Sequence, residues 1–230
     1  SVYLPNIDFL SKFPDVERFD VINSTKVQAD TLNNQLKKNN ISDIDFMKID
    51  TQGHELSILH GSVNYLDNLV GLEIEVEFVP LYKKQPLFNE VDSFIRNHGF
   101  ELFDLHRSLH RRASYQSDYY SRKQVTWAHA LYMKDLELLS DTETIDSMRV
   151  KTTRMLGLAL AFEHFDLARE LAATGPFASI FQDRFGVELL EDVNQYVVYR
   201  TQKILARPPR VLAGADLMQT REKDRHHIYR

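Results

Sequence analysis

The sequence predicts an α/β sheet that ends in an antiparallel pair of strands and is followed by an α-helical extension. Three observations predict this class. An apolar, β-branched run at residues 44–49 leads through a polar turn into leucines spaced three and four residues apart, which is typical of a strand, a turn and a helix. Residues 71–78 alternate apolar and acidic side chains with the period of a strand. Strand patterns at 100–105 and 125–133 follow one another without a helix between them, which favours antiparallel pairing.

The elements before the first clear strand are short. Residues 1–23 have an irregular pattern with one amphipathic turn. Residues 19–28 carry alternating and β-branched side chains, so we expect an extended segment or a hairpin whose strongest part is 25–28. Leucines four residues apart predict a helix over about 32–40.

After the first strand we expect one helix over 54–67 and another over 88–95, which ends at an Asn-His-Gly signal. A basic, tyrosine-rich loop then covers 106–124. Such a loop can bind phosphate or stack bases, or it can be solvated surface chain, and the acidic balance of the whole sequence favours the second interpretation. Two amphipathic helices are expected beyond it, one within about 149–173 and one over about 189–206.

Composition restricts the function classes. The 230 residues are 43% hydrophobic and 27% charged, which is typical of a globular protein. A net charge of -5 gives no general attraction to nucleic acid or to anionic membranes, and we expect neither as a partner. The absence of cysteine excludes disulfides, thiolate chemistry and cysteine-ligated zinc. Since no apolar run approaches the roughly 20 residues that span a bilayer, and no secretory pattern begins the chain, we expect a cytoplasmic protein.

The polar turn after the first strand is the first candidate site. It holds five polar residues: Asp50, Thr51, Gln52, His54 and Glu55. In an open parallel sheet such a turn faces a crevice, where helix N-termini and polar groups bind ligands. A simple helix cap explains the same residues, with Asp50 or Thr51 as the N-cap and Glu55 near the positive end of the helix dipole. Both interpretations stay open.

The alternating strand at 71–78 is the second candidate. Its period puts Glu73, Glu75 and Glu77 on one face. Because a buried unpaired carboxylate is costly, this face must be wet, paired or part of a site. A half-exposed antiparallel strand explains the pattern equally well.

Three other chemistries find little support. His54-Glu55 begins like a zinc-protease helix, but position 58 is isoleucine, so the motif fails. Asp50, His54 and Glu55 have side chains that bind divalent cations, yet we do not expect such a cation. No serine lies in a nucleophile-elbow pattern.

Four blocks of sequence carry a family resemblance: DFMKIDTQGHEL (45–56), LHG (59–61), GLEIEVEFVPLY (71–82) and QPLF (85–88). In this order they resemble the FkbM family of S-adenosylmethionine-dependent methyltransferases. The resemblance is specific over residues 41–105, extends more loosely to about Ser1 and Lys134, and leaves 136–230 unassigned.

The resemblance implies a seven-stranded Rossmann-like sheet of strand order 3-2-1-4-5-7-6. Residues 25–28 would then be strand three, the run ending at Asp50 strand four, and 72–78 strand five, with the last two strands forming the reversed pair. No glycine-rich turn follows a hydrophobic strand here, and no acidic residue follows such a turn to hold the cofactor's ribose. We therefore expect a partial Rossmann-like sheet whose strand-four edge needs covering, for which 25–28 is one candidate.

These expectations divide the chain into three parts. Residues 1–135 would be the C-terminal portion of a methyltransferase domain, 136–207 a helical extension, and 208–230 a flexible polar tail. The cofactor site would lie largely upstream of Ser1, so this chain alone would bind S-adenosylmethionine weakly and be inactive.

The resemblance also implies roles for the polar residues in O-methylation of a hydroxyl on a small molecule or sugar. Histidine titrates nearer neutral pH than aspartate, so we expect His54 as the base and Asp50 as the residue that orients cofactor or acceptor. The expected cofactor contacts are Asp50, Thr51 and Gln52. The expected acceptor contacts are Glu75, Glu77, Tyr82, Lys83 and Gln85.

A rival interpretation is a non-catalytic interaction or scaffold protein built on a remnant methyltransferase half. The partners that we expect are a small-molecule or glycan acceptor and a second copy of the chain, bound through the C-terminal helices.

Overall fold

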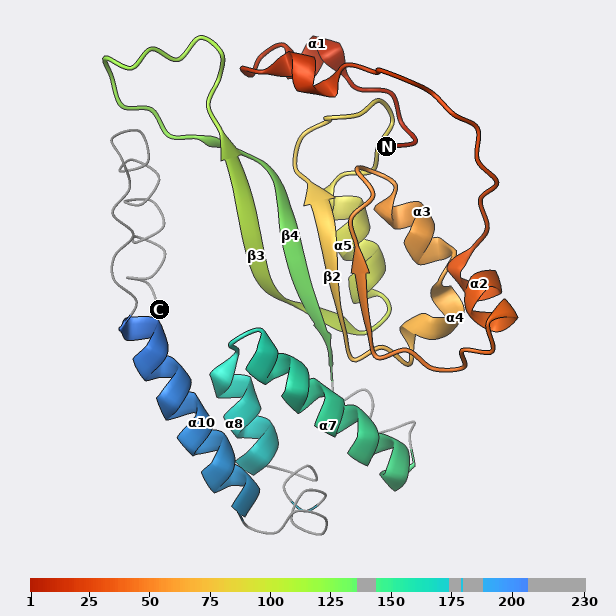
Figure 1. The fold of residues 1–230 in the computed structure, drawn as a ribbon, viewed down its shortest axis with the longest axis vertical. Helices are drawn as coiled ribbons and strands as arrows, with labels where there is room; N and C mark the ends of the chain where they lie inside the picture. Colours follow the sequence, from red (N-terminus) through yellow and green to blue (C-terminus); the bar gives the residue numbers. More distant parts are fainter. Residues whose placement is uncertain (136–143, 174–178, 180–187, 207–230) are drawn as a thin grey trace. The chain divides into compact units, whose positions relative to one another are not determined.

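The structure, a computed structural model, describes residues 1–135, 144–173, 179 and 188–206 (Figure 1). The chain divides into two compact units, the first ending at Glu163 and the second beginning at His164. The first unit contains, in chain order, α1 (Ile7–Leu10), the 3-10 helix η1 (Val16–Phe19), α2 (Leu32–Lys38), β1 (Phe46–Ile49), α3 (Glu55–His60), α4 (Val63–Leu66), β2 (Gly71–Glu77), α5 (Phe88–Arg96), β3 (Phe100–His110), β4 (Gln124–Lys134) and α7 (Ile145–Ala161). The second contains α8 (Phe165–Ala173) and α10 (Glu188–Leu205).

The four strands form one mixed sheet in the order β1-β2-β4-β3 (Figure 1). β1 runs parallel to β2, whereas β4 runs antiparallel to both β2 and β3. The predicted α/β sheet with a final antiparallel pair is therefore confirmed. Because β4 opposes β2, the carboxyl end of β2 at Glu77 lies beside Trp127 near the start of β4. The loop between β3 and β4 and the ends of β1 and β2 consequently lie at the same edge of the sheet.

The apolar positions of β2 lie in the core. Leu72, Ile74 and Val76 are fully buried. They belong to one hydrophobic cluster with residues of α3 and α5, among them Leu59, Val91 and Ile95. Burying each such side chain contributes about 1.5–3 kcal/mol, so the period-two pattern of this strand is strongly fixed by the fold.

The strand predicted at 25–28 is wrong. Residues 20–31 form neither helix nor strand, and Ile22 and Val27 are 98% and 79% exposed. β-branched residues favour strands only where a neighbouring strand accepts their backbone hydrogen bonds. Within the described chain β1 pairs with β2 alone, so no described strand pairs with its other edge.

Two predicted helices are interrupted. The helix expected over 54–67 is divided into α3 and α4, because the chain turns at Gly61, whose carbonyl accepts a hydrogen bond from the Asn33 N–H at 3.0 Å. The helix expected within 149–173 is divided into α7 and α8, and Glu163 between them has a φ of 64°. A left-handed residue cannot continue a right-handed helix.

The other predicted elements form with smaller differences in their bounds. The expected helices near 32–40, 88–95 and 189–206 form as α2, α5 and α10. β3 extends beyond the expected 105 to His110, because its second half pairs with β4, and the loop begins only at Arg111. The predicted tail at 208–230 lies outside the described residues.

Helix α7 is tied to the sheet region of the first unit by polar and aromatic contacts. Arg154 donates to Asp43 at 2.9 Å, and the Phe162 ring lies 5.6 Å from that of Phe46. In the second unit, α8 packs against α10. Of the helices in the described part of the chain, none combines the length and apolar character that a bilayer span requires.

Lys134 closes the end of β4 as a buried cation. Its Nζ donates to the carbonyls of His98 at 2.6 Å and Leu66 at 3.3 Å and lies 4.5 Å from the centre of the Phe100 ring. Burial lowers the pKa of this amine. We expect Lys134→Met to reduce the free energy of unfolding by about 1–2 kcal/mol, because two carbonyls lose their donor. Urea denaturation tests this, with the exposed Lys37→Met as control, and an unchanged midpoint for Lys134→Met would contradict it.

Candidate functional site

The turn between β1 and α3 has a backbone that requires glycine at one position. Gln52 and Gly53 both have positive φ, of 60° and 99°. A Cβ on Gly53 would lie 3.3 Å from the Gln85 Cβ and 3.4 Å from the Tyr82 Cδ2. The backbone angle and the close approach together exclude a larger side chain. The turn is therefore packed against the loop that follows β2.

The capping interpretation of this turn is wrong in its assignment. The N-cap of α3 is His54, whose side chain makes no capping hydrogen bond, rather than Asp50 or Thr51. The Glu55 carboxylate is buried and accepts hydrogen bonds from the Thr51 N–H at 2.8 Å and the Thr51 hydroxyl at 3.0 Å. Glu55 therefore points back into the turn, not into solvent.

Gln52 connects three other predicted site residues. Its Nε2 donates to Glu75 at 2.7 Å and to Asp50 at 3.2 Å. Its Oε1 accepts from the Tyr82 hydroxyl at 3.0 Å. These hydrogen bonds join a predicted cofactor-binding residue, Gln52 in the turn after β1, to two predicted acceptor-binding residues. These are Glu75 on β2 and Tyr82 in the loop after it.

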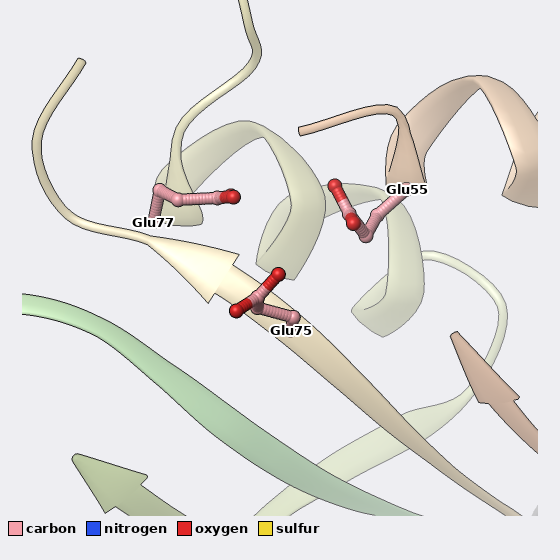
Figure 2. Close-up of side chains that lie close together, drawn as sticks. All are labelled: Glu55, Glu75 and Glu77. Carbon is pink, nitrogen blue, oxygen red and sulfur yellow. The ribbon is translucent and has the colours of Figure 1, made fainter. Parts of the chain in front are cut away.

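Three buried carboxylates converge beside this network. Oxygen atoms of Glu55, Glu75 and Glu77 all lie within 4.8 Å of one another. Figure 2 shows Glu75 and Glu77 projecting from the end of β2 and Glu55 from the start of α3, with their carboxylates turned towards a common space. The three residues, here called the carboxylate cluster, are only 1–5% exposed. At Glu75 and Glu77 the acidic face of β2 is therefore buried, and the half-exposed antiparallel strand considered from the sequence does not describe these two positions.

The electrostatics of the carboxylate cluster favour the protonated acids. Burial first, and then the negative charges of Asp50 and Glu55, raise the pKa of Glu75 to about 8. Burial first, and then Glu55 and Glu75, raise the pKa of Glu77 to about 8 as well. No described lysine or arginine forms an ion pair with the cluster. Near neutral pH these two acids hold protons, and they release them slightly above it.

An all-oxygen set of this kind is also what hard divalent cations such as Mg²⁺ and Ca²⁺ take. The structure groups Glu55 with Glu75 and Glu77 instead of with Asp50 and His54, the set considered from the sequence. Acidic side chains often converge without an ion, so the absence of a divalent cation stays a prediction.

The family comparison agrees with this geometry. Residues 6–102 match the family model of the methyltransferase FkbM domain. They are a portion of an FkbM-family methyltransferase domain. This FkbM portion includes β1, β2, α5 and every member of the carboxylate cluster, and it confirms the resemblance seen in the sequence. Comparison with curated proteins and with solved structures finds no significant match.

His54, the predicted base, lies at the rim of the FkbM portion's site. The ring of Tyr3 packs edge-on against it at 5.7 Å, and its Nδ1 is buried without a hydrogen-bond partner among the described residues. No described hydrogen bond joins His54 to the carboxylate cluster. Its role as base stays a prediction.

The loop after β2 places the remaining predicted acceptor residues differently from one another. Tyr82 and Gln85 are buried, and the Gln85 Oε1 accepts from the Tyr82 N–H, while the Gln85 Nε2 is buried without a partner in the described chain. Lys83 is exposed, and its backbone N–H donates to Leu4 at 2.8 Å. Tyr82 and Gln85 therefore adjoin the turn, whereas the Lys83 side chain lies at the surface.

Sequence reasoning missed the N-terminal segment as part of this site. The Ser1 hydroxyl donates to the Gln52 carbonyl at 2.7 Å, and Asn6 bonds the Pro80 and Leu81 carbonyls through its side chain and its N–H, at 3.1 and 2.9 Å. Tyr3 covers His54. Since these contacts join residues more than 45 positions apart, no local pattern indicated them.

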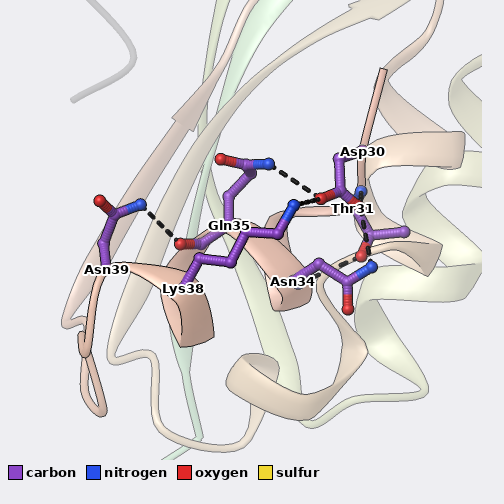
Figure 3. Close-up of polar contacts among 6 residues, drawn as sticks. All are labelled: Asp30, Thr31, Asn34, Gln35, Lys38 and Asn39. Atoms are coloured by element: carbon purple, nitrogen blue, oxygen red, sulfur yellow. Dashed lines mark hydrogen bonds and ion pairs between the residues drawn. The ribbon is translucent and has the colours of Figure 1, made fainter. Parts of the chain in front are cut away.

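A second polar cluster in the FkbM portion is structural. Figure 3 shows Asp30 at the start of α2, where its carboxylate accepts from Lys38 and Asn34, while the Thr31 hydroxyl accepts from the Asn34 N–H as the N-cap. Lys38 first, and then Asn34, lower the pKa of Asp30. This exposed, paired acid differs in its chemistry from the buried acids of the carboxylate cluster, and its contacts stabilise the start of α2.

Proposed function

We propose that these residues form the acceptor side of an S-adenosylmethionine-dependent methyltransferase that methylates a hydroxyl on a small molecule or sugar. The single observation that carries the proposal is the buried carboxylate cluster, at the carboxyl ends of parallel strands inside an FkbM portion. A buried acid whose pKa is raised to about 8 is a stronger base, once ionised, than an ordinary glutamate, and so can take a proton from a hydroxyl.

The sheet order supports the proposal. The order β1-β2-β4-β3 is the order that strands four, five, seven and six have in the Rossmann-like sheet that the resemblance implies. Ligands of open α/β sheets bind outside the carboxyl ends of the parallel strands. Asp50 follows β1 and Glu77 ends β2, so both lie at the edge where that rule expects a ligand.

The residues present suit the cationic end of the methyl donor. When bound, S-adenosylmethionine supplies an electrophilic methyl group on a positively charged sulfonium, next to an ammonium group. Asp50 provides negative charge for these groups, and Thr51 and Gln52 provide hydrogen-bonding groups in the same turn. We propose that the rest of the cofactor site comes from chain outside these residues.

In the proposed mechanism the Glu75 carboxylate takes the proton of the acceptor hydroxyl. S-adenosylmethionine, when bound, would supply the methyl group for the hydroxyl oxygen that Glu75 has deprotonated. Gln52 holds the Glu75 carboxylate, and Tyr82 in turn holds the Gln52 amide. The sequence favoured His54 as the base, and the raised pKa now favours Glu75. Asp50 keeps its proposed role of orienting cofactor or acceptor, and it accepts a hydrogen bond from the same Gln52 amide that donates to Glu75.

The proposal is tested with the natural full-length polypeptide that contains these residues. Labelled S-adenosylmethionine would be supplied with hydroxyl acceptors of two classes, free sugars and small aromatic or aliphatic alcohols. We expect an O-methylated product in one class. Methylation on nitrogen or carbon, or no turnover with any hydroxyl, would contradict the proposal. The methyltransferase portion favours this enzyme over the scaffold alternative, which no feature of the described chain supports.

Calorimetry of residues 1–230 provides a separate prediction. We expect weak or undetectable binding of S-adenosylmethionine, because the sequence has no glycine-rich turn to hold the adenosine half. Micromolar binding to this chain alone would contradict the proposed division of the cofactor site.

A further inference from the structure

A cavity lies in the loop between β3 and β4, and no member of the carboxylate cluster lines it. It has a volume of about 300 Å³. Its lining includes four cationic side chains, those of Arg111, Arg112, Arg122 and Lys123, and the rings of Tyr115 and Tyr119. Among the described residues that line it there is no aspartate or glutamate. A chain with a net charge of -5 therefore concentrates positive charge in one concave place.

The loop is held in shape by its own contacts. The Arg111 guanidinium lies 4.6 Å from the centre of the Tyr115 ring, and its Nε donates to the Ser121 carbonyl at 3.4 Å. The Tyr115 and Tyr119 rings meet edge to face at 5.3 Å. The Ala113 N–H donates to the Lys12 carbonyl at 2.8 Å, which fixes the loop to the N-terminal segment. The cavity is thus formed before any ligand arrives.

The histidine at the base of the cavity lies in this positive field. The His110 Nδ1 is 2.7 Å from the Thr126 hydroxyl oxygen, and its ring contacts Phe13. Burial, followed by the positive charges of Arg18 and Lys123, lowers the pKa of His110. Neighbouring cations that disfavour one more positive charge favour a bound anion.

We propose that this cavity binds the phosphoryl group of a small phosphorylated molecule. Guanidinium groups match the geometry of phosphate oxygens and bind them in pairs of hydrogen bonds. A volume of about 300 Å³ is at the low end of the range for small-molecule sites, so it suits one or two phosphoryl groups with an attached ring better than a polymer. The exposed Tyr119 ring offers a face for that ring. This binding does not depend on methyl transfer.

Titration calorimetry of the chain with inorganic pyrophosphate tests the proposal at about 50 mM salt, where phosphate contacts are strong. We expect saturable binding that Arg122→Gln, a change of an exposed side chain, weakens about fivefold, and that Arg112→Gln with Arg122→Gln weakens tenfold or more. The matched control is Lys26→Gln with Lys37→Gln, which removes the same charge from exposed positions outside the cavity. We expect this control to bind as the wild type does.

A second readout identifies the place of binding. Pyrophosphate should raise the pKa of His110, followed by NMR of its imidazole, in the wild type and the control variant but not in the double arginine variant. Glucose 6-phosphate should compete with pyrophosphate, whereas glucose should not. Absence of binding, equal loss in the lysine control, or a single-stranded oligonucleotide that binds more than tenfold tighter than pyrophosphate would each overturn the proposal.

Discussion

Replacing Glu75 by glutamine should lower kcat for methyl transfer by about 10²- to 10⁴-fold in the full-length polypeptide, with little change in the KM for the acceptor. The amide keeps the size of the side chain, and its oxygen still accepts the hydrogen bond from Gln52, but it cannot take a proton. The matched control is Glu73→Gln on the same strand. Glu73 pairs with Lys48 outside the carboxylate cluster, and its replacement should leave turnover unchanged.

The assignment of Glu75 as the base also predicts how the rate of methyl transfer depends on pH. A base works only when ionised, and the pKa of Glu75 is raised to about 8. We therefore expect kcat/KM to rise with pH and to level off above about 8, and we expect Glu75→Gln to lose this rise. A rate that is independent of pH between about 6 and 9 would contradict the assignment. If His54→Ala and Asp50→Asn both keep wild-type turnover, the sequence-based roles of these two residues are wrong.

Replacing Glu77 by glutamine should make the protein more stable in alkaline solution. The pKa of Glu77 rises from its ordinary 4.5 to about 8 on folding. Between these two pH values the folded chain holds a proton that the unfolded chain has released. The contribution of this acid to the free energy of unfolding is therefore complete below about pH 4.5 and is lost as the pH rises to about 8. Glutamine stays neutral throughout. We expect an advantage of roughly 2 kcal/mol near pH 9 that disappears near pH 5, less than the full shift implies because water and relaxation reduce the penalty.

Urea denaturation of the wild type and the Glu77→Gln variant at several pH values measures this difference. Glu101→Gln, a change on the exposed side of β3, serves as the control and should leave the pH dependence as it is. A difference between Glu77→Gln and the wild type that does not vary with pH would contradict the prediction. If millimolar Mg²⁺ or Ca²⁺ stabilises the wild type at pH 9 but not Glu77→Gln, the prediction that no divalent cation binds is wrong.

Elements with a strong local period were predictable. The alternation of β2, the apolar face of α5 and the sharp stop at Asn97 depend on neighbours in sequence, and the structure contains them as predicted. The strand at 25–28 failed because its hydrogen bonds depended on a partner that the described chain does not place there. The prediction of one continuous helix within 149–173 failed at Glu163, because one left-handed residue ends a helix without changing the apolar period around it.

By itself, the sequence determined the kinds of element, the family of the portion at 6–102 and the turn where polar side chains gather, because periodicity and motifs are properties of neighbouring residues. Only the tertiary structure decided that Glu55, twenty residues away, meets Glu75 and Glu77 in a buried space, and that Tyr3 and Ser1 lie against the turn. The physical reason is that the free energy of a buried charge depends on every group that covers it, wherever that group lies in the chain.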